Sequence, residues 1–220
     1  MDAAKIKQAF EACLRAPYRH YEEGASFAVK RENNCVTVYF EKSNGLTDWR
    51  NNFRFSAKPY HNMPKTWYCH RGFLRVFRAM LPHLLSVFSD ESVTSFVLVG
   101  YSHGAALALL SHEYILFHRP ALAGRVEGYG FGCPRVISGY VPPDLRARLA
   151  GFHIIRCAGD LVTHLPPRLF GYCHPVKPIV IGETLAVSAI DAHRPESYQL
   201  ALDLLLAKER REKQVTKTSG

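Results

Sequence analysis

Apolar and polar positions alternate along this chain between strand-like and helix-like patterns. Short apolar runs rich in β-branched residues predict strands over residues 27–30, 35–40, 95–100, 126–131, 152–158 and 178–181. Apolar residues that recur every three or four positions predict helices over residues 2–14, 72–88, 104–117, 143–149 and 197–208. The order of these elements predicts an α/β fold with a mostly parallel central sheet, an N-terminal edge hairpin and helices on both faces.

Length and composition predict one compact domain. The chain has 220 residues, 47% hydrophobic and 21% charged, which is enough for a sizeable core. We predict a single domain over residues 1–207, followed by a charged, disordered tail over residues 208–220. No apolar run approaches the roughly 20 residues that span a bilayer. The first residues lack a basic segment followed by an apolar one, so we predict a cytoplasmic protein, with export without a signal as the alternative.

The net charge and the spacing of the cysteines limit which partners and ligands we expect. The formal net charge of +9 would suit an anionic membrane surface or nucleic acid, but no nucleic-acid-binding motif is present, so we expect no nucleic-acid partner. Six cysteines occur singly, without the paired spacing of zinc sites. We therefore expect reduced thiols, no metal and no cofactor.

The strongest chemical motif is G-x-S-x-G at residues 100–104, placed between a predicted strand and a predicted helix. A nucleophile at the tip of such a tight turn crowds its neighbours, and Gly100 and Gly104 relieve that crowding. Ser102 would then expose its hydroxyl at the carboxyl end of the strand. We predict that Ser102 is a nucleophile, with an ordinary strand–helix turn as the alternative.

A serine nucleophile needs a base, and the base needs an orienting carboxylate. In this arrangement the partners follow in the order Ser, Asp or Glu, His, each on a loop after a strand. Asp160 follows the strand at 152–158, and His193 lies between the strand at 178–181 and the last helix. We predict Asp160 and His193 as partners of Ser102, with His174 the alternative base and Asp191 the alternative carboxylate.

Several segments, in order along most of the chain, resemble motifs of the class 3 lipase family. They are the elbow at 100–108, F-G-x-P-R-V at 131–136, D-x-V-x-x-L-P-P at 160–167, H-x-G-F at 70–73, and a Tyr after the histidine at 198. The resemblance implies an α/β-hydrolase fold and Asp160 as the catalytic carboxylate.

The resemblance also implies an oxyanion hole formed by the backbone N–H groups of His103 and Ser43. Where the family has Arg-Gly before that serine, this chain has Glu41-Lys42, and losing the glycine changes the path of the loop. Residues 44–68 correspond to the family's lid, with Leu46, Trp49 and Phe53 among its large apolar residues. These side chains could equally form core packing.

The function implied is hydrolysis of carboxylic esters of lipids through an acyl-enzyme on Ser102. Phospholipase A1 or acyltransferase activity on the same residues is an alternative. The Glu41-Lys42 departure motivates a second one, a non-catalytic lipid-binding relic of the fold. We expect a lipid or small ester as substrate and transient contact with a membrane or lipid-droplet surface.

Overall fold

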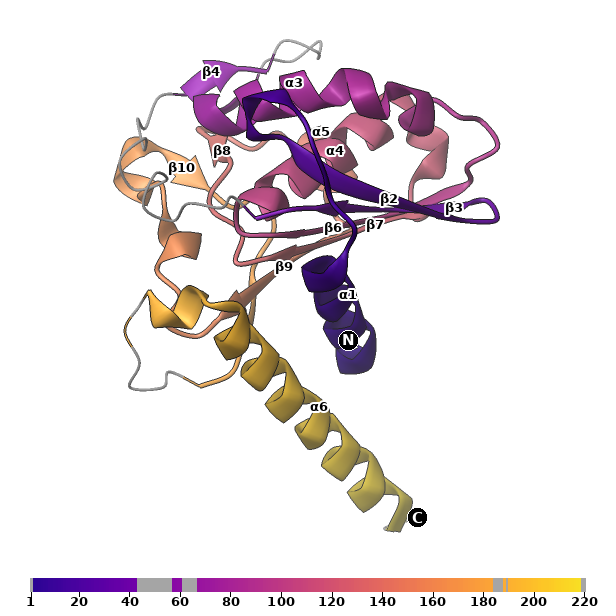
Figure 1. The fold of residues 1–220 in the computed structure, drawn as a ribbon. Helices are drawn as coiled ribbons and strands as arrows, with labels where there is room; N and C mark the ends of the chain where they lie inside the picture. The colour runs from indigo at the N-terminus through magenta and orange to yellow at the C-terminus, as the bar shows by residue number, and fades with distance from the viewer. Residues whose placement is uncertain (1, 43–56, 61–66, 184–187, 189, 219–220) are drawn as a thin grey trace.

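A computed structural model describes residues 2–42, 57–60, 67–183, 188 and 190–218. Seven of the strands in these segments form the main sheet, in the order β1-β2-β3-β6-β7-β9-β11 (Figure 1). Their bounds are β1 Arg19–His20, β2 Ser26–Glu32, β3 Cys35–Phe40, β6 Ser95–Tyr101, β7 Val126–Phe131, β9 Phe152–Cys157 and β11 Ile179–Ile181.

Five strands form the parallel core of the sheet, in the order β3, β6, β7, β9 and β11, and each pairs in parallel with the next. The β2–β3 hairpin joins this core in antiparallel fashion, and β1 pairs outside β2. The predicted mixed sheet with an N-terminal hairpin is confirmed. The carboxyl ends of the parallel strands meet at one edge of the sheet, which is where such folds place their sites.

Helices cover both faces of the sheet, as predicted (Figure 1). The helices are α1 Ala3–Arg15, α3 Arg71–Phe88, α4 His103–His118, α5 Pro143–Arg148 and α6 Pro195–Thr218. Short 3-10 turns are η1 Glu22–Gly24, η2 Pro120–Leu122, η3 Val162–His164, η4 Arg168–Phe170 and η5 Asp191–His193. Helices α3, α4 and α5 lie over one face, and α1 and α6 lie over the other.

Alternation along β6 shows how the sequence builds two cores. Phe96 and Leu98 pack with α3 and α4, whereas Val99 and Tyr101 pack with α1 and α6. Successive strand residues point to opposite faces, so a strand that is apolar at nearly every position must be covered on both sides.

A second, small antiparallel sheet lies beside the main one and was not predicted. Its order is β10-β8-β5-β4, with β4 Ala57–Pro59, β5 Tyr68–His70, β8 Ile137–Ser138 and β10 Tyr172–Cys173. These strands are two or three residues long, too short to show a period-2 pattern in the sequence.

The last helix differs from the prediction. Helix α6 continues to Thr218, whereas the sequence predicts its end at Lys208 and a disordered segment after it. The segment from Glu209 to Lys217 contains neither glycine nor proline and is rich in Lys, Arg, Glu and Gln, which have good helix propensity.

Candidate active site

Ser102 stands at the turn between β6 and α4 in a backbone conformation that few residues adopt. Its φ is 56° and its ψ is −119°, a sparsely populated region that costs roughly 1–3 kcal/mol. A Cβ on Gly100 would lie 2.2 Å from the carbonyl oxygen of Gly104, and a Cβ on Gly104 would lie 2.2 Å from the carbonyl oxygen of Phe40. Both glycines are therefore required by close backbone contacts, as the motif predicts.

The structure brings Ser102, His193 and Asp160 together. His193 Nε2 lies 2.8 Å from Ser102 Oγ, and His193 Nδ1 lies 2.8 Å from Asp160 Oδ2. All three are buried, with exposed fractions of 6% for Ser102, 2% for His193 and 0% for Asp160. The expectation of an exposed hydroxyl on Ser102 is therefore wrong for this structure.

Two further groups donate to the Asp160 carboxylate. Tyr198, from α6, donates its O–H to Oδ2 at 2.6 Å, and the backbone N–H of Val162 donates to Oδ1 at 2.9 Å. Tyr198 is fully buried, and burial, together with the nearby Asp160, raises its pKa well above the usual value. The tyrosine therefore stays a donor, and it stabilises the ionised form of the carboxylate. The sequence located Tyr198 only through the family resemblance, which did not give it this role.

The imidazole of His193 packs closely between a tyrosine ring and a glycine. The Tyr101 ring stacks on it with centroids 5.3 Å apart, and the Tyr101 hydroxyl donates to the His193 carbonyl oxygen. Gly132, with φ +59°, approaches so closely that a Cβ there would lie 2.7 Å from His193 Cε1. The glycine of the F-G-x-P-R-V segment thus makes room for the histidine, a role that spacing alone did not reveal.

Arg135 holds the loop that follows Asp160. Its guanidinium donates to the carbonyl oxygens of His164 at 2.6 Å and Pro166 at 3.1 Å, and its own N–H donates to the carbonyl of Leu165 at 2.7 Å. Two segments of the sequence resemblance, at 131–136 and 160–167, are therefore tied together. This contact fixes the loop from which Asp160 points.

The alternative base and carboxylate lie elsewhere. His174 Nε2 contacts the carbonyl oxygen of Thr163 at 2.8 Å. Asp191 Oδ2 accepts from Ser188 Oγ at 2.6 Å, and its Oδ1 pairs with Arg194 at 3.0 Å. Neither of these contacts involves Ser102.

Of the two residues predicted to form the oxyanion hole, His103 is described. His103 is the first residue of α4, so its N–H has no carbonyl partner within the helix and lies at the helix's positive end. Its side chain is buried against Phe73, with ring centroids 5.6 Å apart. Burial, with a smaller contribution from His70, lowers the pKa of His103 to about 4, so the imidazole is neutral at pH 7. The other residue, Ser43, lies outside the described residues.

The predicted lid residues Leu46, Trp49 and Phe53 also lie outside the described residues. Three other aromatics of the 44–68 segment are described. Two of them belong to the core, whereas Tyr68 is 48% exposed. Tyr60 and Trp67 are buried and stack with centroids 4.6 Å apart. For these two side chains core packing is the correct interpretation.

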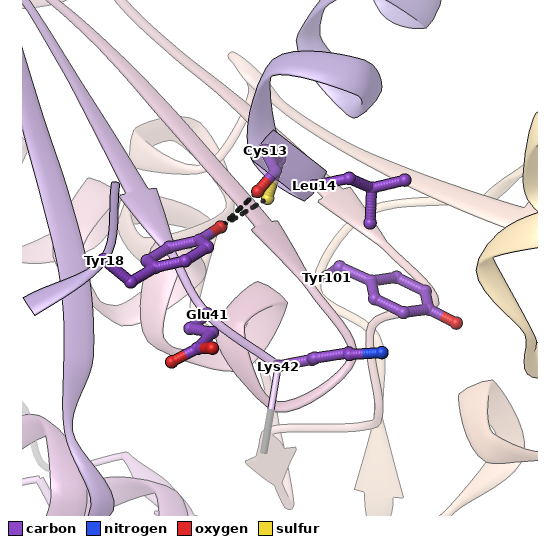
Figure 2. Close-up of a pocket in the computed structure, with 6 residues that line it drawn as sticks. All are labelled: Cys13, Leu14, Tyr18, Glu41, Lys42 and Tyr101. Carbon is purple, nitrogen blue, oxygen red and sulfur yellow. Dashed lines mark hydrogen bonds between the residues drawn. The ribbon is translucent and has the colours of Figure 1, made fainter. Parts of the chain in front are cut away.

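The Glu41-Lys42 departure borders a small cavity below the elbow. The cavity measures about 100 Å³ and is lined by Cys13, Leu14, Tyr18, Glu41, Lys42 and Tyr101. Figure 2 shows the Lys42 side chain extending towards Tyr101, while Glu41 lies on the side of Tyr18. This volume is well below the roughly 300 Å³ of a typical small-molecule site. Among the described residues, Glu41 and Lys42 therefore line a cavity beside the elbow that is too small for a lipid.

The described part of the chain shows no arrangement of three or more His, Cys, Asp or Glu side chains suited to a metal ion. All six cysteines are free. Among the described helices, none is long and apolar enough to cross a membrane.

A parallel sheet with a strained serine at a strand–helix elbow, followed by Asp and His on later loops, defines an α/β-hydrolase. The family model for class 3 lipases matches residues 37–170, more than half of the chain. The chain belongs to the class 3 lipase family.

Individual relatives agree with this assignment. A secreted mono- and diacylglycerol lipase from Fusarium solani is 24% identical over 160 residues, which cover 69% of this chain and 45% of that protein. A lipase from Rhizopus microsporus var. chinensis has a similar structure, with a TM-score of 0.69, 20% identity, and coverage of 86% of this chain and 78% of its own. A triacylglycerol lipase whose catalytic centre is described as a serine protease triad gives a TM-score of 0.63 at 21% identity, covering 74% and 64%. This chain thus spans about half the length of its curated relative.

The predicted cytoplasmic localisation is contradicted by the same comparison, since the curated relative is a secreted lipase. The apparent lack of a signal segment was not a sound basis for that prediction.

Proposed function

We propose that this protein is a serine esterase that hydrolyses carboxylic esters of lipids through an acyl-enzyme on Ser102. The observation that carries the proposal is the pair of 2.8 Å contacts by which His193 bridges the Ser102 hydroxyl and the Asp160 carboxylate. An alcohol is a weak nucleophile at neutral pH, and this bridge is the arrangement that activates one.

In the first half-reaction, His193 Nε2 takes the proton of Ser102 Oγ as that oxygen bonds to the ester carbonyl carbon. Asp160 accepts from His193 Nδ1, fixes the tautomer and stabilises the imidazolium that forms. The tetrahedral intermediate then collapses. The bond to the alcohol oxygen breaks, and the imidazolium gives its proton to the departing alcohol.

The carbonyl oxygen becomes negatively charged in the tetrahedral intermediate and needs donors. The N–H of His103, at the start of α4, is one donor, and we assign Ser43 N–H as the second from the family resemblance. Removing one such donor typically costs about 100- to 1,000-fold in kcat.

In the second half-reaction, a water molecule gives a proton to His193 Nε2 and attacks the acyl carbon. The bond between that carbon and Ser102 Oγ breaks, Oγ recovers its proton from the imidazolium, and a carboxylic acid leaves. Both half-reactions use the same groups and need no redox partner.

The substrate class we propose is acylglycerols, in line with the name of the Fusarium solani relative. Phospholipase A1 or acyltransferase chemistry would use the same residues, so the substrate must be decided by comparing lipids. A non-catalytic relic is disfavoured, since such a protein would not need to keep Ser102 in a strained conformation against His193.

The experiment is turnover of p-nitrophenyl butyrate by the wild type and Ser102→Ala. We expect the variant to keep its fold by circular dichroism and to lose turnover by at least about 1,000-fold. A variant that keeps turnover would place the nucleophile elsewhere. Parallel assays on diacylglycerol and phosphatidylcholine distinguish lipase from phospholipase.

A further inference from the structure

A basic and apolar surface lies next to the Asp160 loop and takes no part in the proposed chemistry. We call it the arginine rim and define it by Arg156, His164, Arg168, Leu169 and Tyr140. Arg156 is at the carboxyl end of β9, His164 closes η3, Arg168 and Leu169 begin η4, and Tyr140 follows β8.

Positive groups crowd together in this rim. Arg156 Nη1 lies 3.1 Å from His164 Nε2, and Arg135 Nη2 lies 3.4 Å from His164 Nδ1, so one imidazole stands between two guanidiniums. Arg168 is close enough to disfavour the charged forms of both Arg135 and His164. Burial, followed by these arginines, lowers the pKa of His164.

In the described part of the chain, Asp160 is the carboxylate that favours the charged form of His164. Residues 135–177 contain two acidic residues, Asp144 and Asp160. Asp144 pairs with Arg148 at 3.5 Å, and Asp160 is engaged by His193 and Tyr198. Asp160 is already engaged elsewhere and is a weak counter-ion for several positive groups. Like charges held together are unfavourable for folding, so an anion from outside would stabilise this cluster.

Large apolar side chains accompany the charges. Leu169 is 90% exposed and Tyr140 is 76% exposed. The segments that carry them lie side by side, because the backbone N–H of Gly139 donates to the carbonyl oxygen of Gly171, and β10 pairs with β8 next to this bond. Exposed apolar residues among basic ones fit a surface that is both negatively charged and apolar below the charges, which is the character of an anionic lipid leaflet.

The position of the rim suits delivery of a lipid to the site. η3 follows β9, and β8 follows β7, so both segments start at the edge where the carboxyl ends of the parallel strands meet. Figure 1 shows β8 and β10 beyond the end of β9 on that side of the molecule. Asp160 stands on the same loop as His164.

We propose that the arginine rim docks the protein on bilayers that contain anionic phospholipid, with the guanidiniums contacting headgroup phosphates and Leu169 and Tyr140 entering the interface. This proposal rests on the proposed function and extends it, since it states which lipid surface the enzyme binds. The docking itself does not depend on hydrolysis.

The test measures co-sedimentation with vesicles of phosphatidylcholine alone or mixed with phosphatidylglycerol. Ser102→Ala serves as the parent so that no lipid is consumed. We expect the parent to prefer the mixed vesicles and to lose that preference as salt is raised. The double variant Arg156→Gln/Arg168→Gln should bind the mixed vesicles about 25-fold more weakly, about fivefold for each arginine. Leu169→Ser should weaken binding about tenfold, through lost apolar burial.

The matched control is Arg125→Gln/Arg211→Gln. It removes the same charge from the residue before β7, at the opposite edge of the sheet, and from the C-terminal half of α6. This control should bind like the parent. Equal binding to both vesicle types, or equal loss in the control and rim variants, would overturn the proposal. So would displacement by inorganic phosphate at constant ionic strength, which indicates a single-anion site, or equally tight binding of duplex DNA.

The proposed ester hydrolysis and the proposed docking surface can be refuted independently of each other. With Ser102 intact, the arginine double variant should hydrolyse soluble p-nitrophenyl butyrate at the wild-type rate. A wild type that binds anionic vesicles but hydrolyses no ester would refute the proposed function and leave the docking surface standing.

Discussion

Replacing Gly104 with alanine tests how the elbow positions the oxyanion donors. Gly104 is the second residue of α4, and its Cα lies against the end of β3. An alanine Cβ would sit 2.2 Å from the carbonyl oxygen of Phe40 and 2.7 Å from that of Glu41. Both clashes are with backbone, which cannot rotate away.

The size of the effect follows from these distances. A carbon–oxygen contact needs roughly 3.2 Å, so the end of β3 must retreat by about 1 Å. That end leads directly into Glu41-Lys42 and the segment that carries Ser43. A displacement of about 1 Å in a catalytic group can cost about 100-fold in rate, and overpacking itself costs about 1–3 kcal/mol. We expect Gly104→Ala to lower kcat on a soluble ester about 100-fold. We also expect it to lower the free energy of unfolding by about 1–3 kcal/mol.

The assay is kcat for p-nitrophenyl butyrate together with urea unfolding. Gly72→Ala is the matched control. Gly72 is likewise the second residue of its helix, α3, and its nearest contact is a side-chain atom of His70 at 3.1 Å. It should keep near wild-type values. Wild-type kcat in Gly104→Ala would refute the claim that the contact between α4 and the end of β3 positions the site.

Two further substitutions test the buried polar groups. Tyr198→Phe removes a donor to Asp160, and hydrogen bonds to charged groups contribute about 1.5–3 kcal/mol, so we expect kcat to fall about tenfold with KM unchanged. In the control, Tyr129→Phe, the hydroxyl that is removed donates to Glu127, and kcat should stay at the wild-type value. An unchanged kcat in Tyr198→Phe would refute a positioning role for Tyr198. Burial raises the pKa of Glu113 from 4.5 to about 7, so the folded state favours the protonated carboxyl. The stability that this group contributes is fully present below pH 4.5, its pKa in the unfolded chain, and is lost as the pH rises through about 7. Urea unfolding should show stability falling less between about pH 5 and pH 8 in Glu113→Gln than in the wild type; identical pH dependence would refute that pKa.

The strands and the elbow could be predicted because their signals are local. Residues 95–104 combine a strand that is apolar at nearly every position with glycines whose spacing reflects backbone contacts. β6, Ser102 and α4 are found where that pattern places them. The order Asp160 then His193 selected the right contacts from 11 histidines, because chain order limits which loops reach the strand ends.

Other features depend on contacts between distant residues and leave little local trace. Tyr198 meets Asp160 across 38 positions, and Arg135 meets His164 across 29. Nothing in the spacing of these residues indicates that they touch, although the family resemblance marked the segments that contain them. The small sheet escaped prediction for a similar reason, since its two- and three-residue strands are defined by their partners.

The most direct test of the central claim is mapping the adduct of a fluorophosphonate on the folded protein by mass spectrometry. Such a reagent reacts with a serine only when a base has activated it. We predict one adduct, on Ser102, that is lost when the protein is unfolded in urea or when His193 is replaced by alanine. No adduct, or an adduct on another residue, would contradict the assignment of Ser102, His193 and Asp160 as the reacting centre.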